Sequence, residues 1–235
     1  MPRIDPRYWA AIFLASVFGT NMGDLYAHES GLGIGLGLAL LAVPTALVFL
    51  AERFEDLHHE IWYWLVIIII RTGATNIADW LAYSARVPAP LLVVGLAAFI
   101  ALFAWLGARR IRAAGLPRTN AGYWLAMLGA GVFGTVVGDM FQHGIGAGVA
   151  AIGLSVLYIV VLRLLGARVA RSAAVYWSIV VIARTAGTAV GDWLAESESL
   201  HIGLPLATLI TGIALAVVIV FWKGQAKGSS SLDAA

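Results

Sequence analysis

The sequence predicts an all-α membrane protein of eight transmembrane helices, built from four parallel two-helix repeats, with both termini in the cytoplasm. The chain is 61% hydrophobic and 12% charged, and its mean hydropathy is +0.89, which is typical of multi-span membrane proteins. It contains eight apolar runs, each of about 20 residues, the length that crosses a bilayer core as a helix. Four of these runs carry the same motif, which ends in Asp.

The apolar runs follow one another along almost the whole chain. The first begins after Arg3 and Arg7, as a signal peptide would, but it carries the motif of three later spans, so we expect a retained helix. The chain has no Cys, which excludes disulfides and thiolate chemistry. The expected spans lie at about 8–27, 32–51, 61–83, 88–107, 121–142, 145–165, 173–194 and 202–222.

Arg and Lys side chains gather on one of the two sets of connections between the spans. The connections at 52–60, 108–120 and 166–172 lie on the same side as both termini and hold most of the positive charge, whereas the other set holds only Arg86. Because short cytoplasmic connections carry the excess of Lys and Arg, this asymmetry places both termini in the cytoplasm.

The repeated motif consists of a small residue, Thr, and then Asp four residues after the Thr. Its four copies are 18–24, 74–79, 132–139 and 187–192. A Tyr-Trp pair begins sixteen residues before every Asp, at Tyr8, Tyr63, Tyr123 and Tyr176. A helical rise of 1.5 Å per residue puts each Asp about 24 Å from its Tyr. We therefore expect the four carboxylates at one level in the outer half of the membrane, and the Tyr-Trp pairs as an aromatic belt at the cytoplasmic interface.

Resemblances among the copies indicate that the chain consists of two duplicated halves. The first and third copies share a His four residues after the Asp, whereas the second and fourth share an upstream Arg-Thr. We expect parallel repeats around a pseudo-symmetry axis along the membrane normal, and a disordered polar tail at 224–235. The predicted halves are 1–110, with repeats 1–57 and 58–110, and 111–223, with repeats 111–168 and 169–223.

The motif supplies the candidate site. Thr and Asp share one helical face, and small residues at four-residue spacing beside them favour contact with other helices rather than lipid. Four Asp at one depth repel one another unless they are protonated, paired or bridged by a cation. The candidate cation-binding residues are Asp24, Asp79, Asp139, Asp192, Thr20, Thr75, Thr135, Thr188, Asn21 and Asn76.

These oxygen ligands suit hard divalent cations such as Mg²⁺, Mn²⁺ or Ca²⁺. A metal site could also include two histidines, which would allow it to bind Zn²⁺. The candidate ligands of that site are Asp24, Asp139, His28 and His143.

Arg71 and Arg184 stand eight residues before an Asp, near the bilayer centre. Because a lone guanidinium there is costly, we expect each to be an intramembrane charge partner for an Asp of another helix. Anion coordination or a positive gate that excludes cations are the alternatives.

The Tyr-Trp, Gly-Thr-x-x-Gly-Asp and Arg-Thr pattern resembles that of a poorly characterised family of bacterial multi-pass proteins, usually called predicted membrane-anchored proteins, over nearly the whole chain. The second copy departs by carrying Ala74 and Ala78 in place of Gly, so a looser helix contact is expected there. The resemblance implies a bacterial inner-membrane protein and supplies no established activity.

The expected function is a transporter or channel for a small cation, a divalent metal ion or one coupled to protons. The expected partners are the lipid bilayer and a small ion, with a homo-oligomer left open and no nucleic acid. No phosphate loop or hydrolase motif supports an enzyme. The alternative is a membrane scaffold or regulatory subunit, which needs the Asp paired with Arg, Trp or Tyr, whereas a transporter needs some of them in a wet cavity.

Overall fold

The chain is described by a computed structural model over residues 2–29, 31, 33–54, 60–108, 119–198 and 200–221. Within these ranges it forms eight long α-helices, as predicted, and no strands. The expected tail at 224–235 and most of the Arg-rich connection at 108–120 fall outside them. The helices are α1 (Pro6–Asp24), α2 (Gly33–Phe54), α3 (Glu60–Asp79), α4 (Ala89–Ala108), α5 (Ala121–Ile145), α6 (Ala147–Leu165), α7 (Ala173–Glu196) and α8 (Leu204–Phe221).

Short polar side chains begin three of the Asp-bearing helices. Asp5, Asn120 and Ser172 cap α1, α5 and α7, each accepting a hydrogen bond from a backbone N–H in the first turn. In the first two repeats the α-helix ends at the motif Asp and continues as one π-helical turn, η1 (Leu25–Glu29) and η2 (Trp80–Ser84). The carboxylates of these two repeats thus stand where the helix geometry changes, a position often found at functional sites.

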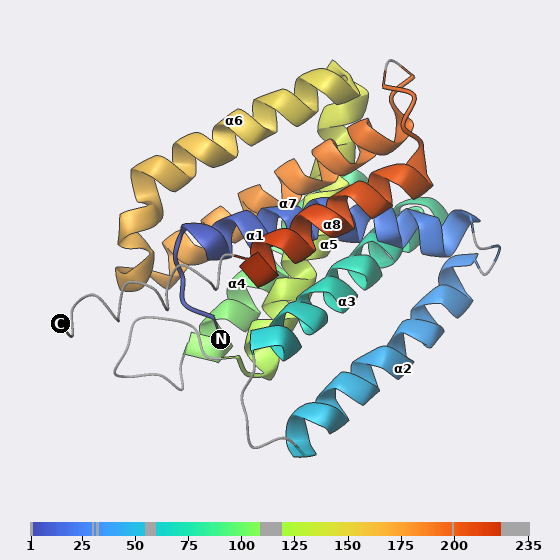
Figure 1. The fold of residues 1–235 in the computed structure, drawn as a ribbon. Coiled ribbons are helices and arrows are strands. Elements are labelled where there is room, and N and C mark those ends of the chain that lie inside the picture. The colour runs from blue at the N-terminus through green and yellow to red at the C-terminus, as the bar shows by residue number, and fades with distance from the viewer. Residues whose placement is uncertain are drawn as a thin grey trace.

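The four Asp-bearing helices form a closed inner ring. α1 contacts α3, α3 contacts α5, α5 contacts α7, and α7 returns to α1. Figure 1 shows these helices at the centre of the molecule, with α2 and α6 on its outside. The two halves of the sequence contribute two neighbouring helices each to this common ring.

Each outer helix packs chiefly on the inner helix of the following repeat. α2 contacts α3, α4 contacts α5, α6 contacts α7, and α8 returns to contact α1. Arg7 of α1 joins this closure, since its Nη2 donates to the carbonyl of Ile219 in α8 at 2.8 Å and lies 3.3 Å from Glu60 of α3. The repeats are therefore interlocked around the ring, and the beginning of α1 and the end of α8 lie at the same end of the bundle (Figure 1).

Small motif residues allow the inner helices to touch. A Cβ on Gly134 of α5 would lie 2.7 Å from the Cβ of Arg184, and a Cβ on Gly19 of α1 would overlap the side chain of Arg71. In the second repeat Ala74 replaces the motif Gly, but it faces Gly131, where an added Cβ would lie 2.7 Å away. The close approach is thus kept at the α3–α5 contact by a glycine on the neighbouring helix.

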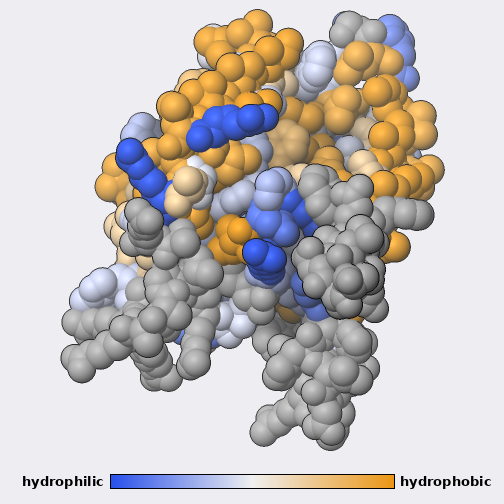
Figure 2. Space-filling model, turned by 60° about the vertical axis from the view of Figure 1, so that its left-hand side comes forward, coloured by the Kyte–Doolittle hydropathy of each residue, from blue (hydrophilic) through white to orange (hydrophobic). Residues whose placement is uncertain are grey.

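The outer surface has the character of a membrane protein. By length and composition, five helices in the described part of the chain could cross a membrane, at 60–84, 89–107, 121–145, 147–169 and 173–196. A shorter apolar helix occupies 204–220. Many large apolar side chains of the outer helices are exposed, and apolar surface covers the upper part of the molecule in Figure 2. Such a surface is stable in contact with lipid rather than water.

Candidate functional site

A row of residues spaced by four faces the axis of the inner ring on every inner helix. On α1 this row runs from Tyr8 through Ser16 and Thr20 to Asp24, and it makes side-chain contacts across the ring at successive levels. Because a row at this spacing is inclined to its own helix axis, the inner helices must be inclined to the bundle axis. The equivalent rows of the other helices form layers of four residues.

The layer farthest from the Asp is a closed ring of four tyrosines. The hydroxyl of Tyr8 lies 2.9 Å from that of Tyr63, which lies 2.6 Å from Tyr123. Tyr123 is 2.8 Å from Tyr176, and Tyr176 returns to Tyr8 at 2.6 Å. Since a hydroxyl can donate once and accept from a neighbour, each tyrosine can satisfy the next around the ring.

The predicted aromatic belt at the lipid interface is therefore wrong for the tyrosines. They point inward, and Tyr8 and Tyr176 are 1% and 0% exposed. The Trp of each pair packs against the Tyr of the preceding repeat around the ring, as in Tyr8 with Trp64 at a centroid distance of 5.8 Å. The physical reason is that four hydroxyls which bond one another can be buried at little cost, whereas an isolated one cannot. The aromatic layer closes this end of the bundle.

Arg184 occupies the next layer. Its side chain is fully buried, and it donates from Nη1 to the hydroxyl of Ser16 at 3.1 Å and from Nη2 to the sulfur of Met127 at 3.2 Å. Both partners lie on neighbouring inner helices, α1 and α5. Arg184 thus points toward the tyrosine ring, and its hydrogen-bond partners are neutral groups rather than the expected Asp.

Arg71 is held by all four motif threonines. Nη1 donates to Thr75 at 2.8 Å and to Thr135 at 3.1 Å, while Nη2 donates to Thr188 at 2.6 Å and also to Thr20. These four bonds use every terminal N–H of the guanidinium. The expected pairing with an Asp is replaced because the threonines lie one turn nearer to Arg71 than the carboxylates do. The motif threonines therefore bind a cation that belongs to the protein.

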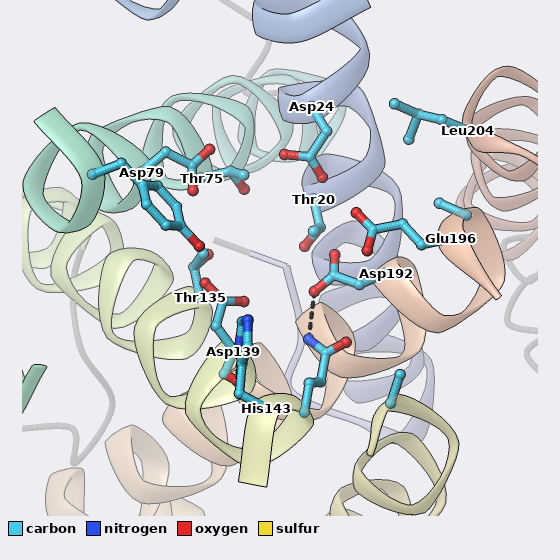
Figure 3. Close-up of a pocket in the computed structure, with 14 residues that line it drawn as sticks. Thr20, Asp24, Thr75, Asp79, Thr135, Asp139, His143, Asp192, Glu196 and Leu204 are labelled. Atoms are coloured by element: carbon cyan, nitrogen blue, oxygen red, sulfur yellow. Dashed lines mark hydrogen bonds between the residues drawn. The ribbon is translucent and has the colours of Figure 1, made fainter. Parts of the chain in front are cut away.

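The four motif Asp line a cavity of about 710 Å³ at the opposite end from the tyrosines, which we call the vestibule. Figure 3 shows Asp24, Asp79, Asp139 and Asp192 entering it from four different helices. Thr20, Thr75 and Thr135 also line it, so the Arg71 layer lies directly beneath. The four carboxylates therefore surround one space, whereas their place in the outer half of the membrane stays a prediction.

Other vestibule residues are harder to recognise from sequence. Gln142 donates from Nε2 to Oδ2 of Asp192 at 2.6 Å, and Tyr83 and Glu196 also line the cavity. Gln142 stands three residues after Asp139, so its place on the same helical face was the available signal. Glu196 stands four residues after Asp192 and adds a fifth carboxylate.

Of the remaining predicted ligands, some line the vestibule and others do not. His143 lines the vestibule, and its Nδ1 lies 2.7 Å from the carbonyl oxygen of Asp139. Asn21 and Asn76 are buried and are not among the residues that line it; a Cβ on Gly191 of the adjacent α7 would lie 2.8 Å from the Asn21 Oδ1. The side chain of His28 lies outside the described part. Within that part, no three His, Asp or Glu side chains come together closely enough to hold one metal ion directly.

A family model described as Repeat of Unknown Function (DUF347) matches residues 7–55 and 175–227. The two matched segments correspond to α1 with α2 and to α7 with α8, so the unit of the repeat is one inner and one outer helix. The predicted internal repeat is thus confirmed, and the chain is similar over two of its four repeats to a family of unknown function. No curated protein and no solved structure matches the chain significantly.

Proposed function

We propose that this chain is a bacterial inner-membrane carrier for a small cation, with eight transmembrane helices, both termini in the cytoplasm and the vestibule open to the outside. The observation that carries the proposal is the vestibule itself. Four intramembrane Asp and Glu196 line one cavity, while both buried guanidiniums hydrogen-bond to neutral groups. Carboxylates gathered around one cavity attract cations.

The form of the cavity favours a divalent ion that keeps part of its water. The carboxylates come from four helices and do not converge in threes on one point within the described residues, and the cavity is far larger than a bare ion. Mg²⁺ and similar ions dehydrate reluctantly and commonly bind carboxylates with several waters retained. Such an ion would be bound, directly or through its water, by oxygen atoms of the four Asp, Glu196 and Gln142.

The closed axis favours a carrier over an open channel. Below the vestibule lie the Arg71 and threonine layer, the Arg184 layer and the tyrosine ring, and the side chains in all three are almost fully buried. A cation that enters the vestibule meets two positive charges and an aromatic seal. Passage therefore requires these layers to move, as in alternating access.

The scaffold alternative makes a different demand on the same residues. In a purely structural network the Asp would be the expected partners of the two buried arginines. The hydrogen bonds of Arg71 instead go to the motif threonines, and those of Arg184 go to Ser16 and Met127. The scaffold becomes the better explanation only if no ion binds to the vestibule.

The test is a thermal melt of the purified protein in detergent with Mg²⁺, Mn²⁺, Ca²⁺, Zn²⁺ or no added ion, across pH. An ion that binds only the folded state stabilises it by about 2.7 kcal/mol at 100 times its Kd. Asp139→Asn should abolish this stabilisation and raise the melting temperature without ions, because repulsion among the carboxylates falls. Glu198→Gln, an exposed site outside the vestibule lining, removes the same charge and should leave the ion response intact.

A positive melt is followed by uptake of the stabilising ion into proteoliposomes. Failure of every ion to shift the melting temperature at any pH would leave the scaffold as the better explanation. An Asp139→Asn protein less stable than the parent would support the scaffold further.

A further inference from the structure

Arg71 and Arg184 occupy equivalent positions in the second and fourth repeats but point to opposite ends of the bundle. Arg71 reaches Thr75, four residues nearer to the vestibule on its own helix. Arg184 reaches Met127, which stands twelve residues before Asp139 and therefore one turn nearer to the tyrosine ring. Both guanidiniums therefore lie near the axis of the ring, one directed toward the vestibule and the other toward the tyrosine ring.

Neighbouring side chains decide which arginine turns which way. Arg184 finds acceptors toward the tyrosines because Ser16 and Met127 lie there. The positions that the repeat makes equivalent around Arg71 hold Gly131 and Ile12, whose side chains accept no hydrogen bond. A buried guanidinium without acceptors is costly, so Arg71 takes the threonine ring. The orientation is therefore specified by the sequence of the neighbouring repeats.

As a consequence, one fixed positive charge lies directly beneath the vestibule. Thr20, Thr75 and Thr135 form its floor, and each accepts a bond from Arg71. The Asp lie four residues further along each helix, a rise of about 6 Å. Held by four bonds and 0% exposed, Arg71 cannot swing out to water.

We propose that Arg71 is the specificity-determining residue of the vestibule. Its charge keeps the bound cation at the level of the carboxylates and off the threonine hydroxyls, which it occupies itself. The charge of Arg71 also offsets part of the negative potential of the vestibule carboxylates. A monovalent ion is then bound too weakly to compete, whereas a divalent ion is attracted twice as strongly by the same potential and stays bound. This inference rests on the proposed function, because it assigns the ion preference of that same site.

The experiment compares Arg71→Met with Arg184→Met, two equally buried charge deletions at equivalent positions. The readout is the Mn²⁺ concentration that gives half-maximal thermal stabilisation, with Na⁺ varied at constant ionic strength. Arg71→Met should lower this concentration by about tenfold, because one opposing charge is lost close to the ion, and should make Na⁺ an effective competitor. Arg184→Met should shift the concentration by less than about threefold, because its guanidinium is farther away.

Arg71→Lys separates charge from structural support. It keeps the charge but cannot bond all four threonines, so it should keep the parent's Mn²⁺ dependence even if the protein melts earlier. A purely structural arginine would instead lower stability in all three variants and leave the Mn²⁺ dependence unchanged.

If Arg71→Met cannot be purified, the double variants decide. Asp139→Asn combined with Arg71→Met restores the net charge of the vestibule and should regain a Mn²⁺ response that Asp139→Asn alone lacks, whereas Asp139→Asn with Arg184→Met should not.

Equal Mn²⁺ dependence in the Arg71→Met and Arg184→Met proteins, or equal responses of the two double variants, would overturn the assignment and leave the cation site standing. A parent protein that no ion stabilises would overturn the proposed function, and this inference with it.

Discussion

Gly134→Ala tests whether the inner ring depends on backbone contact between helices. The added Cβ would lie 2.7 Å from the Cβ of Arg184, 2.8 Å from its carbonyl carbon and 3.0 Å from the nitrogen of Thr185. Two of these atoms belong to the backbone, so no side-chain rotation relieves the overlap and α5 must move away from α7. Overpacking of this kind costs about 1–3 kcal/mol, and we expect the upper end of that range. Alanine recovers up to about 1 kcal/mol as a better helix former, which leaves a net loss of about 2 kcal/mol.

The matched control is Gly153→Ala on the outer helix α6. Within the described part of the chain, no atom lies within 4 Å of a Cβ added at this position, so this variant should gain up to about 1 kcal/mol from helix propensity alone. Thermal or denaturant unfolding in detergent, followed by size-exclusion chromatography, measures the difference of about 3 kcal/mol between the two variants. A Gly134→Ala protein as stable as Gly153→Ala would refute the contact between the motif glycine and the next helix, and with it the interlocked ring.

Two further predictions concern the tyrosine ring and the sidedness of the chain. Tyr176→Phe breaks the closed hydrogen-bond ring and leaves buried hydroxyls of its neighbours without a partner, so it should lower the free energy of unfolding by about 1–3 kcal/mol. The control Tyr83→Phe changes a side chain that is 65% exposed and should be near neutral. Similar melting temperatures for the two variants would count against the ring. Because the chain has no Cys, single cysteines at Glu198 and Thr119 report topology directly: a membrane-impermeant maleimide applied from outside should label position 198, and label position 119 only after permeabilisation. The reverse pattern would invert the orientation inferred from the positive charges.

The miss at the tyrosines has a geometric cause. On an ideal helix a residue sixteen positions before the Asp is rotated by about 160° from it, so Tyr8 and Asp24 are not expected on one face. In the bundle both face the ring axis, because the helices are inclined and the axis follows a row of residues spaced by four. A helical wheel assumes that the residues in contact with a neighbouring helix form a line parallel to the helix axis. That assumption fails where two helices cross at an angle.

The partners of Arg71 were missed for a related reason. Charge complementarity suggested an Asp, and the equal spacing of the four motifs placed the threonines and the carboxylates at known heights. Sequence spacing alone does not say how many helices present their threonines to one guanidinium. Once four do, their hydroxyls satisfy its four terminal donors a turn before the carboxylates are reached.

The sequence by itself determined the helices, the repeat and the height of each motif residue. These follow from apolar length, from the capping residues Asp5, Asn120 and Ser172, and from the constant spacing between Tyr and Asp, all of which act through local geometry along one helix. Only the tertiary structure decided that each outer helix packs on the following repeat, that the tyrosines close a ring, and that Arg71 rather than Arg184 lies under the vestibule. Those outcomes depend on which helices become neighbours and on which acceptors they bring. The contacts of Tyr8 with Tyr63, of Arg71 with Thr188 and of Arg184 with Ser16 each join residues that are more than fifty positions apart in the chain.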